Sequence, residues 1–231
     1  MTLRTAGIGF DFDHTLGVDN GLERRALYRL AAEAGRPIPE DDRRQRAFVE
    51  ALLSEFRAGA CDTQVMLQRF AADLGVPELD PELWRAHCYA LVEALVRPLP
   101  GALEALAALR ERAIPLAILT NGWSPLQQMK ITRALGPQAI ATVLVSDQLG
   151  VAKPARAAFD ALAGLFDGPR EAMWYVGDNA RVDVGGALAA GLRAIWLDRE
   201  GQTYPPELPP PTAVIHHLRE LEALTQNTFA P

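Results

Sequence analysis

The sequence predicts an α/β fold, a doubly wound (Rossmann-like) parallel sheet with a small helical domain inserted after the first strand. Three observations lead to this prediction. A short apolar run near the start of the chain ends in polar residues, a long segment after it carries apolar residues only at helical spacing, and helix-like and strand-like segments then alternate. Such alternation indicates a parallel sheet that helices cover on both faces.

The insertion is predicted from a change in periodicity. The first strand is expected over Ala6–Phe10, which reads as a buried strand. After it, apolar residues recur three and four positions apart, which is typical of helices with one buried face. We therefore predict a helical domain over residues 17–96 and an α/β core formed by residues 1–16 and 97–231.

The remainder of the core is predicted as alternating helices and strands. Helices are assigned from apolar residues at helical spacing, and strands from short runs rich in Ala, Val, Ile and Leu. In chain order we expect helix 102–111, strand 115–120, helix 126–135, strand 142–146, helix 155–165, strand 173–176, helix 184–190, strand 194–197, and an edge strand and helix within 213–224.

Composition narrows the class of protein. The 231 residues carry a formal net charge of −6, which argues against a nucleic acid polymer as partner, because phosphate backbones are held by excess Lys and Arg. No run approaches the roughly 20 apolar residues of a membrane span, and no signal peptide is visible. Cys61 and Cys88 are too few for a disulfide framework and lack zinc-binding spacing. We expect a cytoplasmic protein that does not bind membranes.

Acidic residues follow two of the predicted strands. Asp11 and Asp13 follow the first strand, and Asp178 follows strand 173–176 with Asp183 close behind. Ligands of open parallel sheets bind beyond these carboxyl ends. Residues two apart in an extended chain point the same way, and like charges at close range repel unless a cation or proton intervenes. A hard divalent cation, Mg²⁺, fits such a set of oxygens best.

Two further strand ends carry residues suited to phosphate. Thr120 and Asn121 follow strand 115–120, where a hydroxyl and the N–H groups of the next helix could bind phosphate oxygens. Lysine is scarce: the chain has only Lys130 and Lys153, and Lys153 lies in the loop after strand 142–146. Each feature alone has an ordinary structural explanation, as a turn, a cap or a solvated lysine. Their order and their placement at strand ends together indicate a phosphate-processing site.

Four motifs of the chain resemble those of the haloacid dehalogenase (HAD) superfamily. The resemblance covers the whole α/β core, and the insertion lies where that superfamily has a helical cap. It implies a phosphatase-branch enzyme that acts on a small phosphorylated metabolite with Mg²⁺ as cofactor. The motifs are Asp11-Phe12-Asp13-His14-Thr15-Leu16, Leu119-Thr120-Asn121-Gly122, Gly150-Val151-Ala152-Lys153-Pro154 and Val176-Gly177-Asp178-Asn179 with Asp183 after it.

The resemblance also implies roles for the acidic residues. Asp11 would attack phosphorus and become an aspartyl-phosphate. Asp13 would protonate the leaving alcohol and then activate water. The Asp11 side chain, the Asp13 carbonyl and Asp178 would hold Mg²⁺, with Asp183 as a nearby acid.

The same resemblance assigns the phosphate-binding residues. Thr120 and Lys153 would hold the phosphoryl oxygens, and Asn121 is assigned to the same phosphate site. His14 follows the second aspartate, so it would either contact substrate or line the hinge of the cap.

Several activities of the superfamily stay open or are disfavoured. Dehalogenation does not need an acid at Asp13, and a lysine Schiff base is disfavoured because residues 17–96 contain no lysine. A phosphomutase remains possible, as does a non-catalytic phospho-ligand-binding protein. The segments 120–128 and 150–154 are similar to a subgroup of nucleoside 5′-monophosphate phosphatases, with sugar phosphates and phosphoglycolate as rival substrates.

Overall fold

The computed structural model describes residues 5–228 and has an α/β fold built on one parallel sheet. Its strand order is β5-β4-β1-β6-β7-β8, the order of a Rossmann sheet, in which the chain reverses direction of travel at the first strand. The predicted fold class is confirmed. The strands are β1 (Gly7–Phe10), β4 (Leu116–Thr120), β5 (Thr142–Val145), β6 (Met173–Gly177), β7 (Arg193–Leu197) and β8 (Ala213–Ile215).

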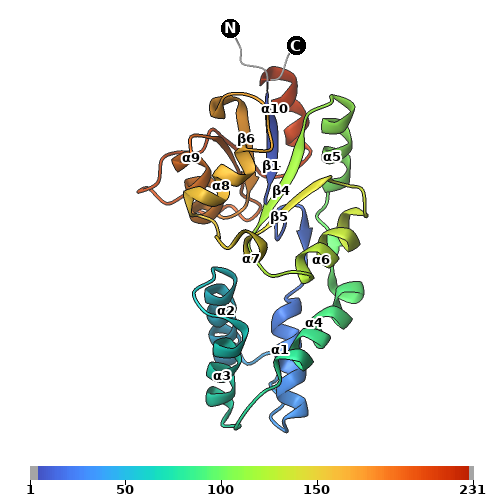
Figure 1. The fold of residues 1–231 in the computed structure, drawn as a ribbon, viewed down its shortest axis with the longest axis vertical. Coiled ribbons are helices and arrows are strands. Elements are labelled where there is room, and N and C mark those ends of the chain that lie inside the picture. The colour runs from blue at the N-terminus through green and yellow to red at the C-terminus, as the bar shows by residue number, and fades with distance from the viewer. Residues whose placement is uncertain (1–4, 229–231) are drawn as a thin grey trace.

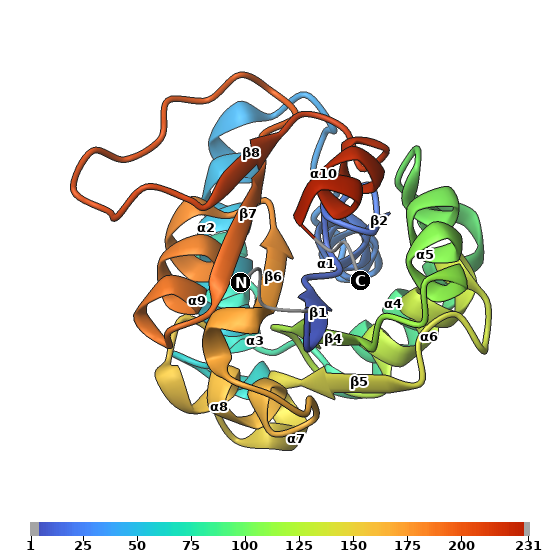
Figure 2. The ribbon, with the colours of Figure 1, turned by 90° about the horizontal axis from the view of Figure 1, so that it is seen from above.

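Helices cover both faces of this sheet, as Figure 2 shows. One face packs against α5 (Ala102–Glu111), α6 (Leu126–Leu135) and α10 (Glu220–Thr228). The other packs against α8 (Arg156–Ala163) and α9 (Gly186–Ala189), while the short helix α7 (Ser146–Leu149) follows β5 directly.

The alternation of glycine and large apolar residues along β1 explains how closely α8 approaches the sheet. Ile8 and Phe10 are buried in the apolar cluster on the α5 side. Gly7 and Gly9 face the other way, where a Cβ on Gly9 would come within 2.4 Å of a methyl group of Leu162 in α8. Bare backbone on that face therefore lets α8 lie directly against the central strand.

Four helices, α1 (Leu22–Glu33), α2 (Arg43–Arg57), α3 (Thr63–Leu74) and α4 (Pro81–Leu95), form a separate layer beyond the carboxyl end of β1 (Figure 1). Three of them begin at an aspartate whose carboxylate accepts a backbone N–H of the first turn: Asp42, Asp62 and Asp80. Such caps satisfy donors that the helix itself leaves unpaired. The all-helical character expected after the first strand is thus observed.

The chain enters and leaves these helices at one place. The two-residue strands β2 (Gly17–Val18) and β3 (Arg97–Pro98) pair in antiparallel fashion, and the N–H of Leu99 donates to the carbonyl of Leu16 at 2.9 Å. Strands this short carry no periodicity, so the sequence did not indicate them. The proposed domain limits at residues 16/17 and 96/97 stay a prediction, and the paired crossing lies next to them.

At two places the structure has a different kind of element from the one predicted. Ser146, expected at the end of a strand, begins α7. The helix expected over 184–190 is interrupted, because residues Ala180–Gly185 form a π-helical turn (η2) before α9 begins at Gly186. Within residues 5–228, no helix combines the length and hydrophobicity that crossing a membrane requires.

Candidate active site

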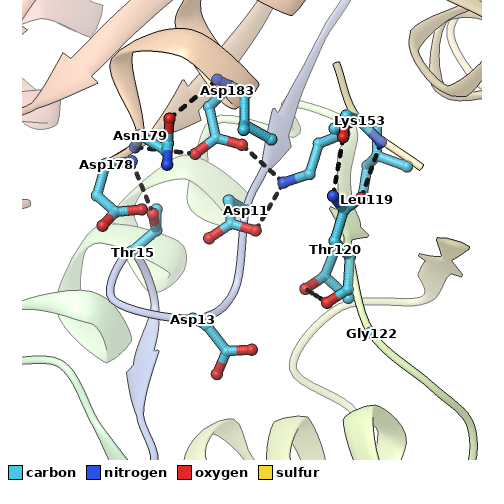
Figure 3. Close-up of polar contacts among 12 residues, drawn as sticks. Asp11, Asp13, Thr15, Leu119, Thr120, Gly122, Lys153, Asp178, Asn179 and Asp183 are labelled. Carbon is cyan, nitrogen blue, oxygen red and sulfur yellow. Dashed lines mark hydrogen bonds and ion pairs between the residues drawn. The ribbon is translucent and has the colours of Figure 1, made fainter. Parts of the chain in front are cut away.

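The candidate active site lies at the carboxyl ends of β1, β4 and β6, around the amine of Lys153 (Figure 3). Its Nζ lies 2.7 Å from Asp11 Oδ1 and 2.7 Å from Asp183 Oδ1. It also donates to the hydroxyl of Tyr175 at 2.8 Å, and that hydroxyl donates to the carbonyl of Leu119. All four side chains that meet here are buried, so the position of the lysine is fixed on three sides.

The π-helical turn explains how Asp183 reaches this site. Asn179 accepts the N–H groups of Arg181 and Val182 at the start of η2. Its own N–H donates to Asp183 Oδ2 at 3.0 Å, which leaves Oδ1 for Lys153. A Cβ on Gly177 would lie 2.4 Å from Cβ of Asp183, so glycine at the end of β6 makes room for this carboxylate.

Asp178 completes a cluster of acids. One ligand oxygen from each of Asp11, Asp178 and Asp183 lies within 4.8 Å of the others. The backbone N–H of Asp178 donates to the hydroxyl of Thr15 at 3.1 Å, which ties this loop to the segment after β1. Three of the four predicted metal-site residues are therefore brought together by their side chains.

The cluster holds more negative charge than Lys153 can balance. Burial, together with the charges of Asp183 and Asp13, raises the pKa of Asp11 to about 7, although Lys153 opposes this. Burial and the charges of Asp11 and Asp183 raise the pKa of Asp178 to about 8. Close carboxylates at least half withdrawn from solvent, with raised pKa values, are the donor set that a hard divalent cation such as Mg²⁺ takes. The residues present therefore fit this cofactor.

Asp13 does not join the cluster. We expected the carboxylates of Asp11 and Asp13 to point the same way, and this is wrong, because the extended strand ends at Phe10. The Asp13 side chain points away from the acids (Figure 3). Its Oδ1 pairs with Lys130 at 2.5 Å, and its Oδ2 accepts from Gln127 at 2.9 Å. The predicted metal ligand at this position is the backbone carbonyl, which stays a prediction.

Thr120 and Asn121 lie at the end of β4, beside Lys153. Thr120 is buried, and its hydroxyl accepts from Gln127 Nε2 at 2.9 Å. The amide of Asn121 pairs with the backbone of Lys153: its Nδ2 donates to the carbonyl at 2.9 Å, and its Oδ1 accepts the N–H at 2.8 Å. Asn121 thus positions the loop of Lys153. Its assignment to the phosphate itself stays a prediction.

His14 follows Asp13 in the chain but is not among the residues that line the neighbouring cavity, and its predicted contact with substrate stays a prediction. His14 is exposed and has a left-handed backbone (φ 63°) in the turn after Asp13. A cavity of about 1110 Å³ lies between the helical layer and the core. Arg57, Arg85 and Tyr89 line it from the helices, and Gly122, Trp123 and Ala152 line it from the core. It therefore adjoins the residues that follow Asn121 and precede Lys153.

Several residues of this region were not identified from the sequence. Lys130 and Gln127 are buried on α6, among the apolar residues that face the core. Asp19 and Glu23 are buried at the start of α1, where Glu23 accepts from Trp123 Nε1 at 2.9 Å and pairs with Arg57 at 2.5 Å. The sequence signal that could have identified such residues is the occurrence of polar side chains among the apolar residues of a helical stripe.

Comparisons with known proteins agree with this geometry. A family model described as haloacid dehalogenase-like hydrolase matches residues 5–191. The chain belongs to the haloacid dehalogenase-like hydrolase family.

Its relatives include several phosphatases. It is 33% identical to the pyrimidine 5′-nucleotidase YjjG of Escherichia coli (strain K12), over 94% of this chain and 96% of that protein. It is 29% identical to the glyceraldehyde 3-phosphate phosphatase of Methanopyrus kandleri, over 82% of each. These relatives confirm the predicted class of enzyme, a HAD-like phosphatase.

Solved structures support the fold. The structure of YfnB from Bacillus subtilis bound to magnesium matches with a TM-score of 0.79 at 24% identity, and covers 96% of this chain and 99% of that one. At this level of identity the likeness supports the architecture alone.

Proposed function

We propose that this phosphatase is a Mg²⁺-dependent phosphomonoester hydrolase that acts on a small phosphorylated metabolite through an aspartyl-phosphate on Asp11. The observation that carries the proposal is the contact of Lys153 with Asp11 and Asp183, both buried, in a cluster that the half-buried Asp178 completes. A carboxylate, a fixed cation and a place for a divalent cation are the elements that phosphoryl transfer to an aspartate needs.

The chemistry assigned to the chain has two halves. A carboxylate oxygen of Asp11 forms a bond to phosphorus while the bond from phosphorus to the ester oxygen breaks, and Asp13 gives that oxygen a proton. Water then attacks phosphorus, Asp13 takes a proton from it, and the bond to Asp11 breaks. Lys153 and Thr120 would hold phosphoryl oxygens throughout.

Mg²⁺ would be held by Asp11 and Asp178, with the Asp13 carbonyl and nearby Asp183. When bound, it would offset the negative charge of the carboxylates and of the phosphoryl group. The raised pKa values of Asp11 and Asp178 support this role, because a cation at the cluster favours their ionised forms.

For the substrate, we propose a nucleoside 5′-monophosphate. The relative that supports this is the pyrimidine 5′-nucleotidase, since its likeness extends over 94% of this chain. The cavity next to the site has aromatic and cationic residues, Tyr89 and Arg57 among them, that could contact a base and an anionic group. Sugar phosphates and phosphoglycolate remain the rival substrates.

The test is phosphate release from nucleoside 5′-monophosphates, sugar phosphates and phosphoglycolate, with and without Mg²⁺. We expect Asp11→Asn to lower turnover by at least about 10³-fold, while exposed Asp41→Asn leaves it unchanged. Acid quenching of the wild type should trap a phosphate on Asp11. Retained turnover in Asp11→Asn, or equal turnover without divalent metal, would contradict the mechanism. A mutase would instead isomerise a sugar phosphate with little phosphate released.

A further inference from the structure

The second lysine of the chain, Lys130, lies in the middle of α6, where a helical surface charge would ordinarily be solvated. It is instead 2% exposed. Its Nζ lies 2.5 Å from Asp13 Oδ1 and 2.8 Å from Asp19 Oδ2, and 5.8 Å from the centre of the Phe12 ring. A buried ammonium is costly unless opposite charges surround it, and Asp13 and Asp19 supply such charges in direct contact with Lys130.

The arrangement fixes Asp13 at both of its oxygens. Lys130 takes Oδ1, and Gln127, one helical turn earlier on α6, donates to Oδ2. The Asp13 side chain is 27% exposed and follows a strand that has already ended, so without these two contacts it would be free to rotate. Its orientation is therefore set by α6.

Lys130 also connects Asp13 to the helical insertion. Asp19 is buried, and its other oxygen accepts the N–H of Gly21 at 3.0 Å, next to the start of α1. The single amine of Lys130 thus lies between Asp13, in the loop after β1, and Asp19, which precedes the first inserted helix by three residues.

We propose that Lys130 is a positioning residue for proton transfer: it holds the Asp13 carboxyl group where its protonated form can give a proton to the leaving group and the resulting carboxylate can later take one from water. The inference rests on the proposed role of Asp13. It does not assign Lys130 to the phosphoryl group, because Lys153 is the lysine that contacts Asp11.

The role predicts a specific kinetic pattern. An alkyl ester needs a proton on its leaving oxygen, whereas a dinitrophenolate leaves without one. Misplacement of a catalytic group by about 1 Å costs about 10²-fold, so Lys130→Met should lower the hydrolysis of an alkyl phosphate such as a nucleoside 5′-monophosphate by about that factor. With enzyme in excess, release of 2,4-dinitrophenolate from its phosphate should stay within about threefold of wild type.

The controls separate this pattern from a loss of structure. Lys130→Gln keeps a donor without the charge and serves if Lys130→Met does not fold, with the same selective loss expected. Asp13→Asn should show the same selectivity with a larger effect. Arg133→Met removes a cation of the same helix that pairs with Glu93 at its exposed edge, and both rates should stay unchanged.

Each result decides the inference. Equal losses for the two substrates in both Lys130 variants, or no loss for either, would overturn it. Failure of the proposed function is recognised separately, because Asp11→Asn would then release dinitrophenolate as fast as the wild type.

Discussion

The two lysines of the chain are both buried between carboxylates, yet their surroundings differ in charge. Lys130 balances Asp13 and Asp19, and Arg57 adds a second cation near them. Lys153 contacts Asp11 and Asp183, and Asp178 completes a cluster of three acids around one cation.

The pKa values report the same difference. Although burial opposes it, the charges of Lys130 and Arg57 hold the pKa of Asp19 below its usual range. The pKa values of Asp11 and Asp178 are instead raised to about 7 and about 8. Two cations, Lys130 and Arg57, face the three acids Asp13, Asp19 and Glu23. Among the described residues only Lys153 faces Asp11, Asp178 and Asp183, so these acids hold protons more tightly and a divalent cation would favour their ionised forms.

Replacement of Lys153 tests the difference between the two lysines most directly. Lys153→Met leaves Asp11 and Asp183 buried without their cation, and breaking a buried pair costs about 3–5 kcal/mol. Activity should fall by at least about 10³-fold for alkyl and dinitrophenyl phosphates alike, since the phosphoryl group loses its partner. Denaturant unfolding and single-turnover rates measure both effects. A loss confined to alkyl esters would mean that the two lysines have been assigned the wrong way round.

Mg²⁺ binding and its dependence on pH test the acidic cluster around Lys153. In the metal-free protein, Asp11 and Asp178 keep protons that they release at about pH 4 when unfolded, so the folded state binds more protons between about pH 4 and 8. Their contribution therefore lowers the stability of the metal-free protein as the pH rises through this range. Mg²⁺ competes with those protons, so its affinity should increase with pH.

The measurement is thermal unfolding with and without Mg²⁺ at pH 5.5 and pH 8. At a concentration of 100 Kd, a ligand stabilises by about 2.7 kcal/mol, which corresponds to about 5–10 °C for a chain of this size. We expect an increase of this order at pH 8 and a smaller one at pH 5.5 for the same Mg²⁺ concentration. An Asp178→Asn variant should lose most of the difference, and an unchanged Mg²⁺ effect across pH would argue against the cluster as the site.

The smallest effect is expected from removing the hydrogen bonds by which Asn121 holds the backbone of Lys153. Asn121→Leu removes both amide contacts with the Lys153 backbone and leaves its carbonyl and N–H without those partners, at a cost of about 1–3 kcal/mol. Turnover should fall by about 10-fold to 100-fold, equally for alkyl and dinitrophenyl phosphates, because the loop that carries Lys153 loosens. Asn121→Asp, which keeps the acceptor for the N–H, should lose less. A larger loss for alkyl esters would connect Asn121 to Asp13 instead.

Much of the fold could be predicted because each core strand is a short, largely apolar run that a polar residue follows. β4 and β7 differ from the predicted strands by one residue at one end, and α5 and α6 match their predicted ranges. The π-helical turn could not be predicted, because its hydrogen bonds depend on Asn179 and on the position of Asp183 instead of on an apolar period. The pairing of β2 with β3 involves too few residues to leave a pattern.

Some residues of the candidate site could likewise be predicted from the sequence, and others could not. The sequence indicated Asp11, Lys153, Asp178 and Asp183, because strand ends of a parallel sheet meet at one edge. It did not indicate Lys130 or Tyr175, since helical periodicity and strand alternation locate buried positions without showing which polar groups meet there. The sequence also did not indicate that the side chains of Asp11 and Asp13 point in different directions. Their directions depend on the turn after Phe10, whose shape is set by tertiary structure.

The pairing of β2 with β3 has a consequence for how such a chain can change. The segment between Val18 and Arg97 begins and ends at adjacent backbone positions, so its length does not affect the positions of the strands in the sheet. Because the entropy of closing a loop grows only slowly with its length, a replacement segment whose own ends meet can be joined there without altering the spacing of β1 and β4. Recombination at this junction would exchange the four inserted helices while leaving Asp11, Lys153 and Asp178 in the core, and the new segment would need an acid in place of Asp19 to pair with Lys130.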